Sequence, residues 1–372
     1  MKLGIITHAS HKTFQKQLYA YEPYVREMNL WIKNADKVKV LAPLSKNSIT
    51  EIDSAYASEA VILKKVPAFN LLTIKNKLAA IAKIPYITFS IFKVFFWADH
   101  IHIRCPGNFG LLACWVQILF PTKKKTVKYA GNWDPNSKQP FSYRLQKKIL
   151  SNTFLTRNVK VLVYGEWQNQ TKNIIPFFTA SYSSSELVKV KSKSLEKQIK
   201  ILFVGTLSEN KRPILTVRAV HQLIDEGNII VLNMFGDGSQ RTEIEEYIKI
   251  NKLEEHIILH GNQSKNRVKE AYLESHFLIF ISKSEGWPKV VAEAMFWGCL
   301  PIVTKVSCVP YMIDEDQRGS LVDDNIDDII KAFNMYLTNH QFYNESANRA
   351  MEWSQQYTLD KLAIEISYLF KN

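Results

Sequence analysis

The chain has 372 residues, 46% of them hydrophobic and 12% aromatic, which is enough apolar material for two buried cores and excludes a disordered protein. Its net charge of +13 is unevenly divided: residues 1–200 hold 31 Lys and Arg against 11 Asp and Glu (+20), whereas residues 201–372 hold 17 against 24 (−7). This asymmetry indicates that the first half meets something anionic, such as nucleic acid, a phosphorylated substrate or a membrane surface.

Several classes of protein are disfavoured. No zinc-finger spacing and no aromatic RNA-binding signature is present, so we expect no nucleic-acid partner. The four cysteines show neither the paired spacing of a zinc site nor the density of a disulfide framework. The N-terminus, MKLGIITHAS, lacks a signal-peptide pattern. We therefore expect a cytoplasmic protein with reduced thiols and no bound metal.

The first half alternates strand and helix signals. Short apolar strands are predicted at 2–7, 37–43, 100–106, 125–131 and 159–165, separated by helix-length segments such as 14–33. This pattern predicts a parallel sheet with helices on both faces.

Residues 74–83 have the pattern of a basic amphipathic helix. Three apolar residues at helical spacing alternate with three lysines before Pro85: Ile74, Leu78 and Ile81 with Lys75, Lys77 and Lys83. Such a helix can lie on an anionic bilayer or can be an ordinary surface helix. The charge of the first half favours a peripheral membrane contact.

The apolar stretch at 84–98 is the longest in the chain. It has about 15 residues and is interrupted by Lys93, whereas a membrane-spanning helix needs roughly 20. We therefore expect a buried helix or strand here.

Polar residues near the ends of two first-half strands are candidates for binding an acceptor or an anionic group. Strand alternation places His100, His102 and Arg104 on one side of the pleat. His102 is either a catalytic base or a core residue, and Arg104 is suited to an anionic group. Asn108 lies in the turn that follows this strand, and the remaining candidates lie around the end of the strand at 125–131: Lys128, Asn132 and Asp134.

A change of composition divides the chain. The polar, Ser- and Lys-rich segment 181–198 is predicted to be a linker between a domain at 1–180 and a second domain at 199–353. We expect a C-terminal helix at about 354–372 to pack back on the first domain. Strands are predicted at 199–205, 229–236, 256–261, 277–282 and 300–304, so the fold class is α/β with two tandem Rossmann-like domains.

The stretch SKSEGWPKVVAEAMFWGCLPIVT, residues 282–304, holds two carboxylates eight residues apart, Glu285 and Glu293. On one helix this spacing would place both side chains on nearly the same face, so both could reach one ligand. The alternative is that they begin a solvated helix, where acidic residues are common.

With its flanking residues, this stretch resembles the donor-binding domain of the family 4 glycosyltransferases, which have the GT-B fold with two domains facing a central cleft. The resemblance covers about residues 200–312, and its most specific part is E-G-x-P followed by E-A-M-x-x-G-x-P. It implies that Glu293 holds the ribose of a nucleoside-diphosphate sugar and that Glu285 holds the transferred sugar. The loop residues Gly286, Trp287, Pro288, Lys289 and Val290 would line the donor, mainly through backbone amides at a helix start.

The resemblance places the diphosphate beside GTLSENKRP, after the strand at 199–205. Gly205 precedes the position of a family arginine, which is Thr206 here, and Lys211 matches a family lysine. Loss of one cation would weaken stabilisation of the leaving group unless Arg212 or a first-domain cation replaces it.

Two further turns complete the expected donor site. Gly236 lies in FGDG, which is either a structural turn or a phosphate-binding turn. By resemblance, His260 and Gly261 would offer backbone contacts to the base.

The implied reaction is transfer of a sugar to an acceptor hydroxyl with retention at the anomeric carbon, without a metal or cofactor. The acceptor would be a saccharide or a lipid-linked saccharide on the inner face of the membrane, in polysaccharide or glycolipid biosynthesis. Lys211, Glu285, Arg104 and His102 are the catalytic candidates. The alternatives are a nucleotide-sugar epimerase of the same fold and a non-catalytic sugar-binding protein. A dinucleotide oxidoreductase is disfavoured because neither first strand is followed by G-x-G-x-x-G.

Overall fold

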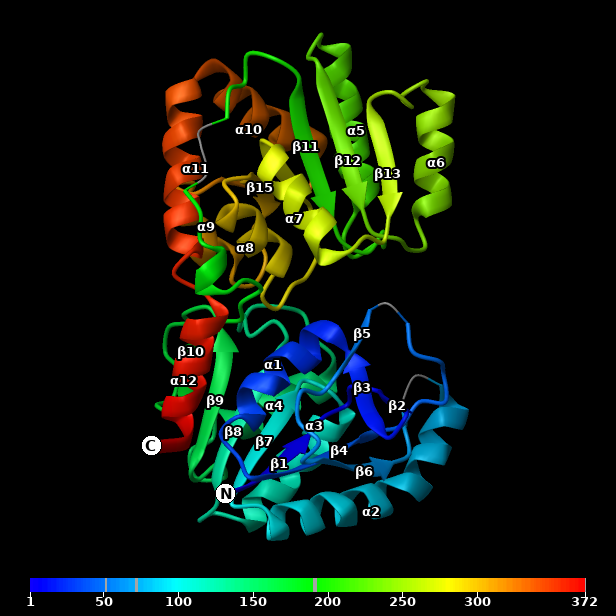
Figure 1. The fold of residues 1–372 in the computed structure, drawn as a ribbon, viewed down its shortest axis with the longest axis vertical. Helices are drawn as coiled ribbons and strands as arrows, with labels where there is room; N and C mark the ends of the chain where they lie inside the picture. The colour runs from blue at the N-terminus through cyan, green and yellow to red at the C-terminus, as the bar shows by residue number, and fades with distance from the viewer. Residues whose placement is uncertain (51, 71–72, 190–192, 372) are drawn as a thin grey trace. The chain divides into compact units, whose positions relative to one another are not determined.

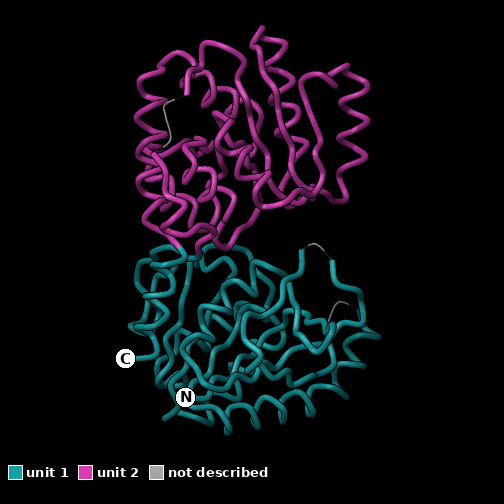
Figure 2. Tube along the Cα trace, viewed as in Figure 1, with its two compact units in different colours: residues 1–179, 359–372 teal, residues 180–358 magenta. Residues whose placement is uncertain are grey.

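The computed structural model describes residues 1–50, 52–70, 73–189 and 193–371. The chain divides into two compact units: unit 1 comprises residues 1–179 and 359–372, and unit 2 comprises residues 180–358 (Figure 2). Each unit contains a parallel sheet with helices packed on it (Figure 1). Two Rossmann-like domains of the α/β class, as in the GT-B fold, were predicted, and this prediction is confirmed.

Unit 1 is built on a seven-stranded parallel sheet in the order β10-β9-β8-β7-β1-β4-β6. The strands are β1 (Lys2–Ile6), β4 (Lys37–Pro43), β6 (Val61–Val66), β7 (His100–Cys105), β8 (Lys124–Tyr129), β9 (Val159–Tyr164) and β10 (Ile174–Phe177). The helices are α1 (Glu22–Ile32), α2 (Ile74–Trp97), α3 (Asn108–Val116), α4 (Phe141–Leu150) and α12 (Leu359–Lys371), with a 3₁₀ turn η1 (Gln117–Leu119).

Strand alternation decides which helices cover which face of this sheet. On β7, His102 stacks against Trp31 of α1 and His100 lies against Phe370 of α12, so α1 and α12 share one face. Ile101 and Ile103 point to the opposite face, into the core that includes α2 and α3. Gly4 on β1 permits this packing, because a Cβ there would lie 2.7 Å from Val94 of α2.

A small antiparallel sheet was not predicted. Residues 14–33 were expected to contain one helix, but β2 (His11–Phe14) and β3 (Gln17–Tyr21) form a hairpin that pairs with β5 (Asp53–Ala55), and α1 begins only at Glu22. The turn of the hairpin is at Gln15 and Lys16, which both have positive φ, as a two-residue hairpin turn requires.

Unit 2 is built on a six-stranded parallel sheet in the order β13-β12-β11-β14-β15-β16. The strands are β11 (Ile199–Val204), β12 (Ile230–Phe235), β13 (Ile257–Gly261), β14 (Phe277–Phe280), β15 (Leu300–Thr304) and β16 (Ser320–Val322). The helices are α5 (Pro213–Asp225), α6 (Arg241–Ile250), α7 (Lys265–Glu274), α8 (Lys289–Phe296), α9 (Val309–Ile313), α10 (Ile326–Thr338) and α11 (His340–Ser354), with a 3₁₀ turn η2 (Ser184–Glu186).

The order of the strands places the candidate loops together. The chain reverses direction across the sheet between β11 and β14, which are neighbours although three helices separate them in sequence. The loops that follow these two strands, residues 205–212 and 281–288, therefore lie side by side at the carboxyl edge, where open α/β sheets bind ligands.

Candidate functional site

Glu285 lies in the loop after β14, not on a helix. Helix α8 begins only at Lys289, with Pro288 as its N-cap, so the expectation that Glu285 and Glu293 project from one helix is wrong. Pro288 stands where the helix begins, a position that tolerates proline because its N–H would have no intrahelical partner. Both carboxylates nevertheless remain in unit 2, one before α8 and one within it.

The Glu285 carboxylate has two partners. Its Oε1 accepts a hydrogen bond from the Ser282 hydroxyl at 2.5 Å and forms an ion pair with Lys211 Nζ. Lys211 comes from the loop after β11, and its side chain is 22% exposed against 9% for Glu285. The cation predicted for the diphosphate and the carboxylate predicted for the sugar are therefore in direct contact.

Backbone hydrogen bonds hold the two loops together. The Lys283 amide donates to the Asn210 carbonyl at 2.8 Å, and the Asn210 side-chain amide donates to the Ser284 carbonyl at 3.1 Å. Ser282 is fixed from the other side, because its amide donates to Thr304 Oγ1 at 3.0 Å and its carbonyl accepts from that hydroxyl at 2.7 Å. The Lys211–Glu285 pair thus lies in loops whose backbones are held in place.

The residues between Glu285 and α8 are anchored by their surroundings. The Gly286 carbonyl accepts hydrogen bonds from Ser307 Oγ at 3.2 Å and from Cys308 Sγ at 3.1 Å. The indole of Trp287 is buried and stacks on Trp353, so only the backbone of this residue can face a ligand. Backbone amides at the start of α8, at Lys289 and Val290, are the type of donor that binds an anion at a helix N-terminus.

Glu293 lies on α8 and accepts hydrogen bonds from two hydroxyls. Ser181 Oγ donates to its Oε1, and Tyr272 on α7 donates to its Oε2 at 3.3 Å. Burial and then the nearby Glu293 charge raise the pKa of Tyr272 well above its ordinary value, so Tyr272 stays a donor. A carboxylate has about four lone-pair positions and can accept further hydroxyl donors beside these two.

Ser181 and Tyr272 were missed by the sequence analysis. Ser181 was placed in the predicted linker, but Lys265 Nζ donates to the Ser181 carbonyl at 2.7 Å and fixes this segment on α7. No local pattern announced either contact, since the two residues are 112 and 21 positions away from Glu293 in sequence.

The glycines of the neighbouring turns are explained by close backbone packing. A Cβ on Gly236 would lie 2.0 Å from the Gly205 carbonyl oxygen, and a Cβ on Gly238 would lie 2.5 Å from the Leu207 carbonyl oxygen. The FGDG segment is therefore a structural turn that brings the loops after β11 and β12 together, and no ligand is needed to account for Gly236.

His260 and Gly261 close the same edge. The His260 imidazole stacks on Phe235 and its Nε2 lies 2.8 Å from Asn233 Oδ1, so the ring is held along the sheet. Burial, with the nearby Arg267, lowers the pKa of His260 and favours the neutral ring. The Gly261 carbonyl accepts a hydrogen bond from the Gly236 amide at 2.8 Å.

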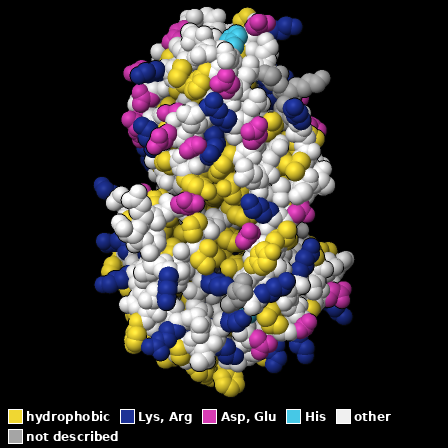
Figure 3. Space-filling view, turned by 90° about the vertical axis from the view of Figure 1, so that its left-hand side faces the viewer, with side chains coloured by type: hydrophobic (Ala, Val, Ile, Leu, Met, Phe, Trp, Pro, Cys, Tyr) yellow, Lys and Arg dark blue, Asp and Glu magenta, His cyan; other side chains and the backbone are white. Residues whose placement is uncertain are grey.

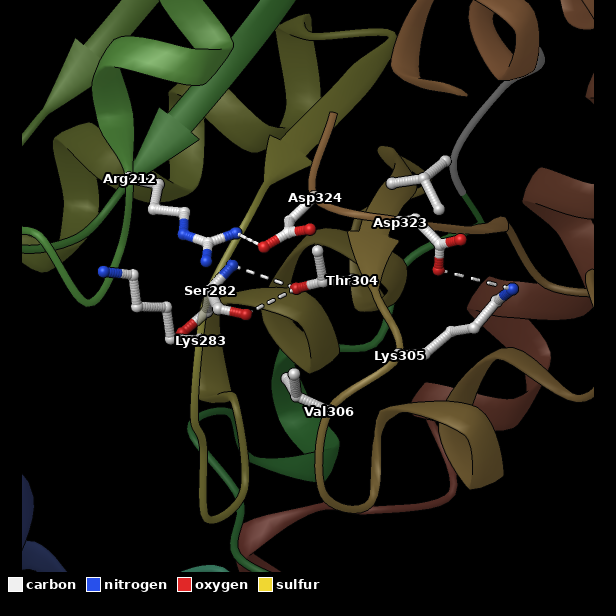
Figure 4. Close-up of a pocket in the computed structure, with 9 residues that line it drawn as sticks. Arg212, Ser282, Lys283, Thr304, Lys305, Val306, Asp323 and Asp324 are labelled. Carbon is white, nitrogen blue, oxygen red and sulfur yellow. Dashed lines mark hydrogen bonds and ion pairs between the residues drawn. The ribbon is translucent and has the colours of Figure 1, made fainter. Parts of the chain in front are cut away.

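Arg212 lies in a separate pocket of about 230 Å³ next to the Glu285 loop (Figure 4). Its guanidinium pairs with Asp324 and thereby lowers the pKa of that carboxyl group. Ser282 lines this pocket and also donates a hydrogen bond to Glu285, so it connects the Arg212 pocket with the Lys211–Glu285 pair. Thr206 is exposed.

The candidate base His102 is a core residue. It is fully buried, its ring centroid lies 3.9 Å from that of Trp31, and its Nδ1 lies 3.0 Å from Thr126 Oγ1. Burial lowers its pKa well below the ordinary value, so the ring is neutral. In this position His102 cannot exchange a proton with a substrate, and its interpretation as a catalytic base is corrected.

The candidate cations of unit 1 are bonded within that unit. Arg104 pairs with Glu27 of α1 at 2.6 Å. Lys128 is fully buried, donates to the Phe178 carbonyl at 2.7 Å and lies over the rings of Tyr164 and Phe177. Lys128 therefore cannot bind an acceptor without leaving the core.

The other first-domain candidates lie in turns. Asn132 Oδ1 accepts from the Asp134 amide at 2.8 Å, and Asp134 Oδ1 accepts from the Asn136 amide at 2.8 Å, so both carboxamide and carboxylate shape the loop after β8. The Asn108 side chain donates to the Phe69 carbonyl at 3.4 Å. All three residues are partly exposed.

The sequence analysis missed His8, which follows β1 at the carboxyl edge of the unit 1 sheet. It is exposed directly after β1, and a Cβ on Gly107 would lie 3.1 Å from its Nδ1. Desolvation and then the charge of Arg104 lower the pKa of His8, which makes it neutral at pH 7. A histidine immediately after a predicted parallel strand was the signal that could have identified it.

Across the described ranges, no group of three or more His, Cys, Asp or Glu side chains is arranged to hold a metal ion.

Comparison with known proteins places this site in a recognised family domain. Residues 184–353 match the family model described as glycosyl transferases group 1. An uncharacterised glycosyltransferase of Haemophilus influenzae is 26% identical over 205 residues, which cover 54% of this chain and 56% of the relative. A Campylobacter jejuni enzyme, named as an α-1,4-N-acetyl-D-galactosaminyltransferase acting on an undecaprenol-linked saccharide, is 28% identical over 182 residues, covering 46% of this chain and 48% of the relative.

The fold matches over the whole chain. The crystal structure of Anabaena HepE in complex with UDP and glucose aligns with a TM-score of 0.70 at 11% identity and covers all of both chains. At this identity the likeness establishes the GT-B fold alone. By sequence, the chain spans about half the length of the curated relatives named above.

Proposed function

We propose that this chain, whose residues 184–353 carry a glycosyl transferases group 1 domain, transfers a sugar from a nucleoside-diphosphate sugar to an acceptor hydroxyl. The observation that carries the proposal is the Lys211–Glu285 pair at the carboxyl edge of the unit 2 sheet, beside Glu293 and the start of α8. A cation, two carboxylates and backbone amides are the groups that a diphosphate and sugar hydroxyls require.

Each group has one role in this proposal. Glu293 accepts the ribose hydroxyls, Glu285 accepts hydroxyls of the transferred sugar, and Lys211 neutralises the diphosphate. When the donor binds, the Lys211–Glu285 ion pair is replaced by two contacts with the ligand: Lys211 binds the diphosphate and Glu285 binds the sugar. Ser282, which already donates to Glu285, keeps the released carboxylate oriented.

The diphosphate has fewer cations here than the family pattern implies. Thr206 stands at the position of the family arginine, and Arg212 is engaged by Asp324. Lys211 and the amides at the start of α8 therefore provide most of the stabilisation of the leaving group in this proposal.

The proposed reaction retains the configuration at the anomeric carbon and uses no metal. The bond from the anomeric carbon to the leaving phosphate oxygen breaks, and a bond to the acceptor oxygen forms on the same face. The acceptor proton passes to the leaving phosphate oxygen, so no protein nucleophile is consumed and no His102 base is needed.

The acceptor is proposed to be a saccharide or a lipid-linked saccharide of a cell-surface polysaccharide or glycolipid, met at the cytoplasmic face of the membrane. The printed name of the Campylobacter jejuni relative, whose acceptor is undecaprenol-linked, supports this choice. The positive charge of the first half of the chain supports it independently.

Calorimetric titration with nucleoside diphosphates and nucleotide sugars tests the donor roles. Glu293→Ala removes charge-assisted hydrogen bonds and should weaken binding of the nucleoside diphosphate about 10- to 100-fold. Glu285→Ala should leave nucleoside-diphosphate binding within about threefold of wild type but lower sugar transfer at least about 100-fold. Unchanged nucleotide affinity in folded Glu293→Ala protein would refute the ribose role.

One observation favours a non-catalytic binding protein as the second candidate, namely the missing arginine at Thr206. Donor binding without turnover across a panel of acceptors would support that alternative. Formation of a new sugar isomer from donor alone would instead identify an epimerase.

A further inference from the structure

Helix α2 carries an apolar stripe that faces solvent along its whole length. The stripe consists of side chains spaced three or four residues apart, all of them exposed: Ile74, Leu78, Ile81, Pro85, Phe89, Phe92 and Phe96. The exposed fractions reach 78% at Ile74 and 75% at Phe96. A surface helix normally turns such residues inward, so this stripe needs another explanation.

The stripe is not the core face of the helix. Ala80, Ile87, Ile91, Val94 and Phe95 are buried on the sheet side, where α2 packs against β1, β4 and β6 (Figure 1). At 3.6 residues per turn these positions fall on the side of the helix away from the stripe. Helix α2 is therefore apolar on two sides. Among the described residues, the stripe side has one ring contact within unit 1, between Phe92 and Phe120 at 5.1 Å, and the stripe side chains remain exposed.

This finding corrects the expectation for residues 84–98. They were predicted to form a buried helix or strand. They belong to one helix, α2, which runs from Ile74 through Pro85 to Trp97 and is buried on one face only. Within the described part of the chain, α2 is the one helix long and apolar enough to cross a membrane by length and composition. Its inner face, however, belongs to the core of unit 1, so only the outer face is available.

Lysines flank the stripe, and acidic residues are absent from the sequence of α2. On the helical wheel, Lys75 and Lys93 fall on one side of the stripe and Lys77 on the other, and all three are exposed. Lys93 Nζ lies over the Phe89 ring, 4.4 Å from its centroid. These side chains can cover apolar surface with their methylenes and keep their ammonium groups in water.

Lys83 does not belong to this flank. Its Nζ donates to the Ala68 carbonyl at 3.0 Å, and its helical position is on the side away from the stripe. The three lysines grouped by the sequence analysis are therefore not equivalent: Lys75 and Lys77 border the stripe, and Lys93 takes the place expected of Lys83.

The charge of the surrounding unit has the same sign. Unit 1 contains 28 Lys and Arg against 11 Asp and Glu, a net charge of +17, whereas unit 2 contains 20 against 24, a net charge of −4. Dark blue Lys and Arg side chains are scattered over the face of unit 1 in Figure 3. An anionic surface would therefore attract unit 1 and not unit 2.

We propose that α2 lies flat in the interface of an anionic lipid bilayer, with its apolar stripe in the acyl boundary and its flanking lysines at the lipid phosphates. From Ile74 to Phe96 the stripe is about 33 Å long at 1.5 Å per residue, so the whole helix makes the contact. A second copy of the chain fits the stripe less well, since it would bring like-charged lysines against each other. The inference goes beyond the proposed sugar transfer and does not depend on it.

Co-sedimentation with lipid vesicles tests this surface on the full chain without any donor. We expect binding to vesicles of phosphatidylcholine containing phosphatidylglycerol, weaker binding to phosphatidylcholine alone, and a decrease from about 0.1 M to about 1 M salt, where the screening length falls from about 10 to about 3 Å. The stripe variant Phe89→Ser/Phe96→Ser should bind at least about tenfold more weakly. The matched control Phe141→Ser/Phe154→Ser changes two phenylalanines outside α2, each 72% exposed, and should bind like wild type.

A charge pair of variants tests the flank independently. Lys93→Glu should lower binding to anionic vesicles roughly tenfold, and Lys83→Glu should change it less than about threefold. Circular dichroism and thermal unfolding should be unchanged in the stripe variant and in Lys93→Glu, because the altered side chains face solvent, and they show whether Lys83→Glu and the phenylalanine control are folded.

Three outcomes would overturn the proposal. The first is that the wild-type chain does not bind anionic vesicles. The second is that the stripe variant and its phenylalanine control lose vesicle binding equally. The third is that the stripe mediates self-association in analytical ultracentrifugation without vesicle binding. Because no donor is present, failure of the proposed transferase activity would leave each of these results unaffected.

Discussion

Two ion pairs of similar burial lie at the carboxyl edges of the two sheets, and they differ in the elements that carry them. In unit 1, Arg104 near the end of β7 pairs with Glu27 inside α1, with side chains 13% and 6% exposed. In unit 2, Lys211 and Glu285 are 22% and 9% exposed, and both lie in loops. The first pair joins two regular elements, whereas the second joins two loops.

We infer from this difference that the Arg104–Glu27 pair stabilises the fold, whereas a ligand can separate the Lys211–Glu285 pair. Moving Arg104 away from Glu27 would leave a buried charge on a helix that cannot adjust, and breaking such a pair costs about 3 to 5 kcal/mol. Lys211 and Glu285 can part by side-chain rotation in their loops, and a diphosphate and sugar hydroxyls would replace the lost contacts. Similar chemistry thus serves stability in one unit and, as we propose, exchange in the other.

The largest expected effect is on stability in unit 1. Arg104→Met should lower the free energy of unfolding by about 3 to 5 kcal/mol in urea denaturation, since it leaves Glu27 buried without its partner. The double variant Arg104→Met/Glu27→Leu should recover most of the loss. Lys211→Met is the matched comparison and should cost less than Arg104→Met, because Glu285 keeps the hydrogen bond from the Ser282 hydroxyl and its loop side chain can rotate toward water. Equal losses in the two single variants would remove the distinction between the pairs.

An intermediate effect should appear in acid. Burial lowers the pKa of His100 from 6.5 to about 4 in the folded protein. Above pH 6.5 His100 is therefore mainly neutral in both the folded and the unfolded chain. Between pH 6.5 and 4 the unfolded chain binds the proton first, so stability falls as pH falls, by about 3 kcal/mol when the whole interval is crossed.

His100→Gln removes this titration while keeping a polar partner for Thr126 Oγ1. Urea unfolding at several pH values between 7 and 4 should therefore show a shallower acid slope for the variant. A slope identical to wild type would mean that His100 does not contribute. The readout concerns unit 1, so donor affinity at pH 7 should be unchanged.

The smallest expected effect is that of metal removal on the proposed transfer. The Lys211–Glu285 edge offers a cation and helix amides to a diphosphate, so excess EDTA should change the rate of sugar transfer by less than about twofold. Loss of activity in EDTA that magnesium or manganese restores would contradict the metal-free mechanism. That result would also indicate that Glu285 or Glu293 binds a metal ion and does not only accept hydroxyl groups of the donor.

The three strands of the parallel sheets that the sequence analysis missed share a location. Strands β6, β10 and β16 are edge strands of their sheets. Strand β6 carries Lys64 and Lys65, β10 carries Pro176, and β16 has only three residues. Edge strands tolerate lysine and proline because one side of their backbone is unpaired. Nine of the ten predicted strands lie in the interior of the two sheets, and the tenth, β13, is an edge strand that was recognised from the apolar run HIILHG.

The candidate residues divide in the same way. Glu285, Glu293 and Lys211 were selected because the residues around them resemble a family motif, and the structure brings Glu285 and Lys211 into contact. His102 and Lys128 were selected from strand alternation alone, which indicates a face of the sheet and not whether that face is covered. Helix α1 covers the face at His102, through Trp31.

The sequence by itself determined the two parallel sheets and the loops that follow their strands, because these follow from local apolar periodicity. The residues of the candidate donor site were instead indicated by the resemblance of residues 200–312 to a glycosyltransferase family. Only the tertiary structure decided that Glu285 pairs with Lys211, that Ser181 and Tyr272 donate to Glu293, and that one apolar face of α2 stays exposed. Those outcomes depend on contacts between residues far apart in the chain. Helical periodicity identifies an apolar stripe, but whether protein, lipid or water meets it depends on what the rest of the chain packs there.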